Sequence, residues 1–208
     1  RASVFCQRYV AKHPDVSAAR REYLLANFYL RSIGEEIGKT FAEFSNEFDE
    51  HIGFLDVDDA ALAWDRLGHW AQDDENWREA ERCFRQAYDA AGGHFGYCLG
   101  TTLNFLGRFE ESLPLLLEQA ERIQPDPLSW FQVGAAHAEL GNTDQSVVAY
   151  RKAIDLDPDY ALAWFNLGGV HWNDRDMGAA LIVWQQAVTK FPDHEMATRV
   201  RALLPLIR

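Results

Sequence analysis

Cysteine and long apolar runs are scarce in this chain of 208 residues. Its three cysteines, Cys6, Cys83 and Cys98, are an odd number and form no CxxC pair. This pattern predicts neither a disulfide framework nor a zinc knuckle, and it favours a reducing compartment, so we expect a cytoplasmic protein. No stretch approaches the roughly 18 consecutive apolar residues of a membrane span.

Basic residues are outnumbered, with 20 Lys and Arg against 32 Asp and Glu, a formal net charge of −12. Such a surface repels phosphate backbones and anionic lipid, so we expect neither a nucleic acid nor a membrane partner. Hydrophobic residues make up 48% and charged residues 25%, as in ordinary folded proteins.

The stronger enzyme signatures are also missing. The sequence has no GxxxxGK[ST] phosphate loop, no GxSxG nucleophile elbow and no HExxH pair. No nucleophile, base and orienting acid can be grouped from spacing alone. We therefore predict no enzyme, no catalytic residue, no metal site and no cofactor.

What the sequence does have is an internal repeat. Within "DPDYALAWFNLGGVHW", Trp164, Leu167, Gly168 and His171 lie on one face of a helix, and the same pattern begins 34 residues earlier at Trp130. A second helix follows in each copy, with small and aromatic residues at fixed places. Weaker matches precede these two, so we predict four copies, at 61–92, 93–126, 127–160 and 161–194.

Glycine inside a helix costs about 1 kcal/mol relative to Ala. A Gly that recurs at one place in each first helix therefore predicts that another backbone approaches closely there. The aromatic residues would fill the space beside these contacts. A helical hairpin of this kind buries its apolar face only by stacking on its neighbours.

These residues resemble the tetratricopeptide repeat, in the 34-residue period, the Trp-x2-Leu-Gly-x2-large pattern of the first helix, the Ala-x3-aromatic-x2-Ala pattern of the second helix and the closing Pro. The resemblance covers about two-thirds of the chain. It implies an all-α fold, a right-handed solenoid of antiparallel helix hairpins.

The two ends match less well. "AKHPDVSA" resembles "TKFPDHEMA" near residue 190, so residues 2–12 would be the back half of a repeat in a longer array. Residues 1–60 are predicted as a helical region with a degenerate hairpin over 17–32 and 35–50. Residues 195–208 are predicted as a capping helix, ended or kinked by Pro205, whose leucines either pack on the last hairpin or meet a partner.

Some polar residues of the repeats invite a metal-binding interpretation. Asp155, Asp157 and Asp159 alternate as in a calcium loop, but Tyr160 stands where that loop needs Gly, so we predict a turn between repeats. His137 and His171 occupy a packing column, and Cys83 and Cys98 are predicted as small thiols on adjacent helices.

In the family that the chain resembles, the first helices line a concave surface that holds a peptide. The resemblance places twelve residues on this first-helix face: Asp65, Arg66, His69, Tyr97, Thr101, Asn104, Phe131, Gln132, Phe165, Asn166, Trp172 and Asn173. Aromatic rings can bury an apolar side chain while amides hydrogen-bond a backbone. Phe131 and Phe165 can alternatively pack between neighbouring hairpins. Only Arg66 is basic in this set, so the carboxylate clamp of chaperone-binding relatives is not expected.

The sequence thus predicts a non-catalytic scaffold that binds a protein or peptide segment, neutral or basic overall. Two alternatives stay open. The chain can be the repeat region of a larger enzyme, such as a glycosyltransferase or sulfotransferase, or a structural solenoid that self-associates.

Overall fold

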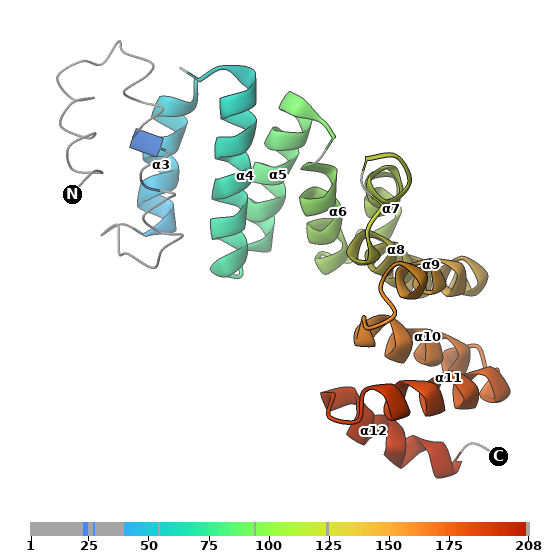
Figure 1. Cartoon of the computed structure of the whole chain (residues 1–208). Helices are drawn as coiled ribbons and strands as arrows, with labels where there is room; N and C mark the ends of the chain where they lie inside the picture. Colours follow the sequence, from blue (N-terminus) through green and yellow to red (C-terminus); the bar gives the residue numbers. More distant parts are fainter. Residues whose placement is uncertain are drawn as a thin grey trace. The chain divides into compact units, whose positions relative to one another are not determined.

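The chain is built from helices in the computed structural model, which describes residues 23, 24, 27, 40–53, 55–93, 95–123 and 125–206. Those residues contain no strand (Figure 1). The helices are α3 (Phe41–Ile52), α4 (Val57–Asp73), α5 (Trp77–Ala91), α6 (Phe95–Phe105), α7 (Phe109–Glu118), a π-helical turn (Gln119–Ile123), α8 (Pro127–Glu139), α9 (Thr143–Leu156), α10 (Ala161–Asn173), α11 (Met177–Lys190), α12 (Glu195–Leu203) and a 3₁₀ turn (Leu204–Leu206).

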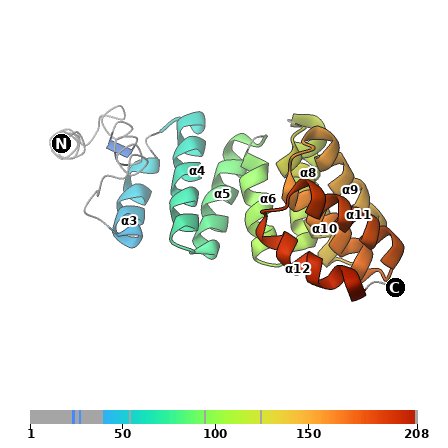
Figure 2. The ribbon, with the colours of Figure 1, turned by 60° about the horizontal axis from the view of Figure 1, so that its bottom comes forward.

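The helices pack as hairpins within two compact units, residues 1–102 and 103–208. In the first unit α4 packs on α5; in the second, α8 packs on α9 and α10 on α11 (Figures 1 and 2). Successive hairpins of the second unit also contact each other, because α9 packs on α10. The fold is the predicted all-α solenoid of helix hairpins.

One turn joins the two helices of every copy. The residues Glu75, Gly107, Gly141 and Arg175 all have a positive φ, between 56° and 73°. The amide of the next residue reaches back five positions in each case, as in the 2.9 Å bond from Asn142 N to His137 O. This is the Schellman ending of a helix, which favours Gly at the left-handed position. Two of the four copies therefore hold a non-Gly residue in a conformation that costs L-residues energy.

The recurring helical glycines lie under aromatic rings. A Cβ added at Gly68 would lie 2.6 Å from the Phe84 ring, and one at Gly134 would lie 2.9 Å from the Tyr150 ring. At Gly168 the Cβ would lie 2.2 Å from Trp184. The predicted close approach is confirmed, but the prediction of a neighbouring backbone was wrong. The neighbour is the aromatic side chain of the second helix, because the large ring needs the room.

Aromatic residues dominate the core of the first unit. Phe44 and Phe48 are completely buried, and their rings contact Trp70 at 5.1 Å and Trp64 at 4.5 Å between centroids. Thr40 is the N-cap of α3, and its side chain forms a capping box with the Glu43 carboxylate. The predicted helix over 2–12 and the start of the one over 35–50 lie outside the described residues, and of the predicted helix over 17–32 only residues 23, 24 and 27 are described, all three of them helical.

The end of the second unit is covered by α12. Ala197 and Val200 are buried against Phe165 and Trp184, and Leu203 packs on the same cluster. The helix gives way to the 3₁₀ turn that contains Pro205, as Pro in a helix interior would require. The leucines at positions 203 and 204 thus pack on the last hairpin.

The copy at 93–126 contains an irregular second helix. α7 holds Pro114 and passes directly into the π-helical turn Gln119–Ile123. A π-helical turn takes up one residue more than an α-helical turn. Against the repeat pattern of the other copies, this copy holds one extra residue before Ala120 and Pro125, and the π-helical turn lies at that place.

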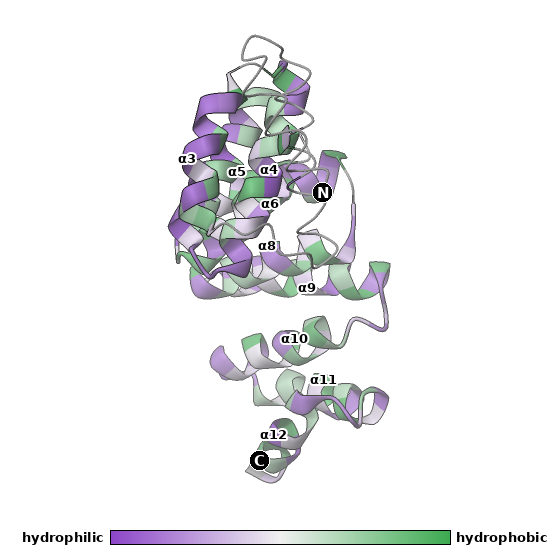
Figure 3. Ribbon diagram, turned by 90° about the vertical axis from the view of Figure 1, so that its left-hand side faces the viewer, coloured by the Kyte–Doolittle hydropathy of each residue, from purple (hydrophilic) through white to green (hydrophobic). Residues whose placement is uncertain are grey.

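Hydropathy varies along every labelled helix, so that hydrophilic and hydrophobic residues alternate rather than forming one apolar block (Figure 3). Among the described residues, no helix has both the length and the apolar content needed to cross a membrane.

Candidate functional site

The first-helix face of the first unit contains charged residues held close together. Asp65 and His69 are one helical turn apart on α4, and His69 Nε2 lies 3.6 Å from Asp65 Oδ1. The Asp65 side chain is only 16% exposed, whereas that of His69 is 50% exposed. Arg66 is exposed beside them, and on α6 Tyr97 is half-buried. Thr101 is buried.

Burial raises the pKa of the Asp65 carboxyl above its usual range, and the nearby charges of His69 and Arg66 offset this only in part. An acid with a raised pKa binds a proton more readily than an exposed aspartate does.

In the second unit, amides on this face bond to each other. Asn104 Nδ2 donates to the backbone oxygen and to the side-chain oxygen of Gln132, both at 3.2 Å. The Ser112 hydroxyl donates in turn to the Asn104 side chain. The two amides therefore connect first helices of successive repeats, and part of their hydrogen-bonding capacity is already used.

The two phenylalanines of this face each contact the N-cap residue of the helix that follows their hairpin, Tyr160 before α10 and His194 before α12. Phe131 lies edge-on to Tyr160 at 5.2 Å between ring centroids, and Phe165 stacks on His194 at 5.0 Å. Both partners are 29 residues further along the chain. Phe165 is only 1% exposed, so the packing interpretation describes it. Phe131 is half-buried and also contacts Tyr150.

Besides Phe165, three residues of the predicted set lie on α10. Trp172 is half-buried, with its ring 5.5 Å from that of Trp184. Asn166 is half-buried, and Asn173 is exposed. None of the twelve predicted residues lines the hollow described next.

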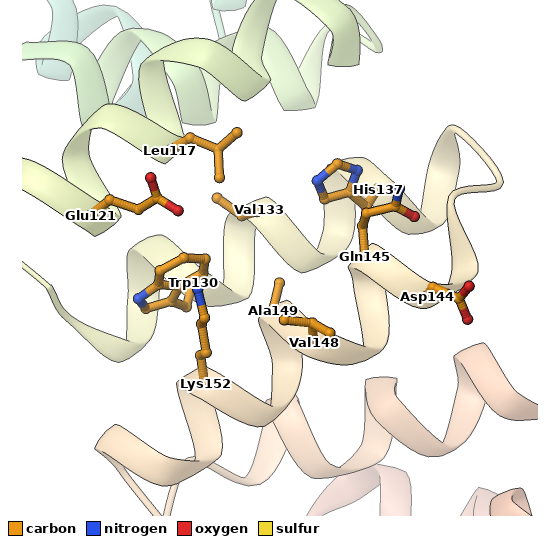
Figure 4. A pocket seen from close by; sticks show the side chains of 10 residues that line it. All are labelled: Leu117, Glu121, Trp130, Val133, His137, Asp144, Gln145, Val148, Ala149 and Lys152. Atoms are coloured by element: carbon orange, nitrogen blue, oxygen red, sulfur yellow. The ribbon is translucent and has the colours of Figure 1, made fainter.

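A hollow of about 380 Å³ lies between the π-helical turn and the second helix of the next repeat. We call it the Trp130 groove, lined by Leu117, Glu121, Trp130, Val133, His137, Asp144, Gln145, Val148, Ala149 and Lys152. Figure 4 shows Leu117 and Val133 pointing toward each other from different helices, with His137 and Gln145 adjacent at one end. Its floor is apolar and its rim is polar.

A second hollow of about 430 Å³ continues the first, because both are lined by Glu121, Trp130 and Lys152. It extends to Pro125 and Leu156, at the end of α9.

The charges around the Trp130 groove are mainly negative. Glu121, Asp144 and Asp155 line the two hollows. Lys152, the one cation among the lining residues, has its Nζ 3.6 Å from the centre of the Trp130 ring, a cation–π contact visible in Figure 4. Burial lowers the pKa of His137, so this imidazole is neutral at pH 7.

Sequence reasoning missed this groove, since it assigned Trp130 and His137 to packing and looked for a site on the other helical face. One feature of the sequence could have pointed to the groove. The extra residue before Pro125 marks the copy in which the second helix departs from α-helical geometry, and such π turns are frequent at functional sites.

Comparisons with known proteins agree with the paired helices. Two family models match, one described as "TPR repeat" over residues 134–174 and one as "Tetratricopeptide repeat" over residues 63–93. No curated protein matches.

Among solved structures, YrrB, described as a TPR protein with an unusual peptide-binding site, is 23% identical, with a TM-score of 0.72 over 95% of this chain and 98% of that one. The C-terminal part of a TPR repeat-containing protein from Cytophaga hutchinsonii is 11% identical, with a TM-score of 0.69 over 91% and 73%. MamA from Desulfovibrio magneticus is 15% identical, with a TM-score of 0.61 over 74% and 95%. The family models thus identify tetratricopeptide repeats at residues 63–93 and 134–174, and the solved structures share the fold of paired helices.

Proposed function

We propose that the chain is a non-catalytic protein-interaction module and that its Trp130 groove binds a neutral or basic segment of a partner protein. The tetratricopeptide fold is typically an interaction module, and a protein or peptide is the partner class that the family suggests. YrrB, whose fold is similar, is described as having a peptide-binding site.

The observation that carries the proposal is the composition of the groove. An apolar floor with a polar rim suits an apolar side chain of the ligand together with its peptide backbone. Val148 is 53% exposed on the second helix, so an apolar side chain of the groove lining is open to contact with a ligand.

Charge defines the partner further. Three carboxylates line the two hollows, while the Lys152 ammonium lies on the Trp130 ring. A segment with Lys or Arg beside an apolar anchor is complementary to this arrangement, and the chain's net charge of −12 would also attract it.

The predicted peptide site on the first-helix face remains a second candidate surface of the same module. Its exposed or half-buried members in the second unit, such as Gln132 and Asn173, are the ones that could contact a ligand. Phe165 is 1% exposed and offers little surface to a ligand.

The chain offers a matched pair of variants for the test. Val148 on α9 and Ile182 on α11 are 34 residues apart, so they occupy the same place in successive repeats, and they are 53% and 60% exposed. Val148→Arg puts a long cationic side chain over the groove, whereas Ile182→Arg makes the same change of charge outside it.

Peptides would be selected from a random display library on the full chain, and their affinities measured by calorimetry. We expect selected sequences with an apolar anchor and flanking Lys or Arg. Val148→Arg should weaken their binding at least about tenfold, because loss of a central apolar contact costs more than 1 kcal/mol. Ile182→Arg should leave it within about twofold.

Equal binding by both variants would contradict recognition in the groove. If Gln132→Ala abolished binding while Val148→Arg did not, the first-helix face would be the site instead. Failure to select any peptide at all would contradict the proposed function itself.

A further inference from the structure

Three side chains of different chemistry converge on the first-helix face of the first unit. Asp65 and His69 come from α4 and Cys98 comes from α6, and one potential ligand atom of each lies within 4.8 Å of the other two. Positions i and i+4 share one face of a helix, which explains how α4 presents both its residues to Cys98. The proximity of Cys98 to Asp65 and His69 cannot be predicted from the sequence, because it depends on how α6 packs.

We propose that Asp65, His69 and Cys98 form a binding site for a divalent transition-metal cation of the Zn²⁺ type. A carboxylate, an imidazole and a thiolate are the three kinds of side chain that bind zinc in proteins.

The distances fit a tetrahedral ion. His69 Nε2 lies 3.6 Å from Asp65 Oδ1 and 3.7 Å from Cys98 Sγ. Ligand bonds of about 2.0–2.3 Å at tetrahedral angles place neighbouring ligand atoms about 3.3–3.6 Å apart. His69 Nε2 is thus within a few tenths of an ångström of the required separation from both other atoms, and Asp65 and Cys98 lie within 4.8 Å of each other. Three protein ligands leave a fourth position for water or for a group of another molecule.

A second layer of contacts orients the imidazole. His69 Nδ1 lies 3.1 Å from Gln72 Oε1, so the ring can donate its proton there and keep the Nε2 lone pair directed at the ion. The Gln72 amide donates onward to the buried Thr102 hydroxyl at 3.2 Å. The Phe84 ring contacts the imidazole edge-on, with centroids 5.1 Å apart.

The thiol favours transition-metal cations over Mg²⁺ and Ca²⁺. Sulfur is a soft ligand that binds Zn²⁺ well, whereas Mg²⁺ and Ca²⁺ prefer oxygen. Burial, with the Asp65 carboxylate beside it, raises the pKa of the Cys98 thiol to about 12. The thiol is therefore protonated without a cation, and metal binding would replace its S–H bond with a metal–sulfur bond and release the proton to solvent. The half-exposed His69 side chain leaves a path for the ion to enter.

The test uses the full chain freed of metal by a chelator. Zn²⁺ would be titrated in competition with a chromogenic chelator, and Co²⁺ binding would be followed by its sulfur-to-cobalt charge-transfer absorption. We expect one equivalent of Zn²⁺ per chain and a clear Co²⁺–thiolate band. Cys98→Ser should abolish the band, and both Cys98→Ser and Asp65→Asn should weaken Zn²⁺ binding at least about 100-fold. Gln72→Ala should weaken it about tenfold or more, as loss of an orienting partner does.

Matched controls separate the site from the other thiols and carboxylates. Cys83 is buried elsewhere in the first unit and Asp58 lies in the first turn of α4, so Cys83→Ala and Asp58→Asn should leave both readouts unchanged. Circular dichroism would establish that each variant is folded. A band that persists in Cys98→Ser, Zn²⁺ binding unchanged by Asp65→Asn, displacement by equimolar Mg²⁺, or no binding by the parent chain would overturn the proposal.

Discussion

At the scale of single residues, the helical glycines and the aromatic rings above them determine how tightly each hairpin closes. Gly168 faces Trp184, whose indole N–H donates to the Phe165 backbone oxygen at 3.0 Å. The indole ring is therefore held both by its contact with Gly168 and by its hydrogen bond to the Phe165 backbone. Gly169, its neighbour in sequence, has nothing within 4 Å of an added Cβ.

We predict opposite effects of one methyl group at these adjacent positions. Gly168→Ala should lower the free energy of unfolding by about 1–3 kcal/mol, because the held indole must move. Gly169→Ala should raise it by about 0.5–1 kcal/mol, because Ala is the better helix former. Chemical denaturation followed by circular dichroism measures both. A Gly168→Ala protein as stable as its parent would show that the ring is not tightly held.

The residue scale also shows where sequence reasoning ends. The spacing of Trp, Gly and Ala is sufficient to place the buried columns, since these residues interact within one hairpin. Phe165 could not be decided in the same way, because its burial depends on His194 and on α12. The cluster of Asp65, His69 and Cys98 likewise depends on a contact between helices of different repeats.

At the scale of elements, the turn between the two helices has the same conformation in each copy, but the residue at its left-handed position is not the same in every copy. Gly107 and Gly141 suit the left-handed position, and the conformation there is identical in kind for Arg175, with φ of 65°. A non-Gly residue costs about 1–2 kcal/mol in this region, offset by about 0.4–1 kcal/mol of lower entropy in the unfolded chain.

Arg175→Gly is accordingly predicted to stabilise the protein by about 0.5–1 kcal/mol, and Gly141→Arg to destabilise it by about 1 kcal/mol. Urea denaturation of the two variants would measure both changes. The same sign for both substitutions would contradict the common geometry of these turns.

The elements themselves follow from the repeat pattern, and α8, α9, α10 and α11 lie within the copies predicted at 127–160 and 161–194. The repeat pattern did not predict that a π-helical turn would accommodate the extra residue. The sequence shows one extra residue there, and an extra residue can be absorbed by a loop, a bulge or a π turn at similar cost. Packing of that turn beside α8 and α9 selects one of these, and with it the position of the Trp130 groove.

At the scale of the whole molecule, the chain combines a strongly negative charge with repeats whose cores are complete. Its buried columns are filled by its own side chains, so recognition depends on surfaces that the repeats leave open. The Trp130 groove is such a surface in the second unit. The carboxylates that line it are negative, as is the chain as a whole, with a net charge of −12. Fold and charge were accessible from sequence, whereas the proposed Trp130 groove required the structure.

Amide hydrogen exchange, measured by mass spectrometry on the full chain with and without a selected peptide, tests the central claim most directly. Binding in the Trp130 groove should slow exchange most in the π-helical turn Gln119–Ile123 and in residues 145–152 of α9, which carry the lining side chains. Protection confined to residues 165–173 of α10, with none in the π-helical turn, would contradict the claim and place the peptide on the first-helix face.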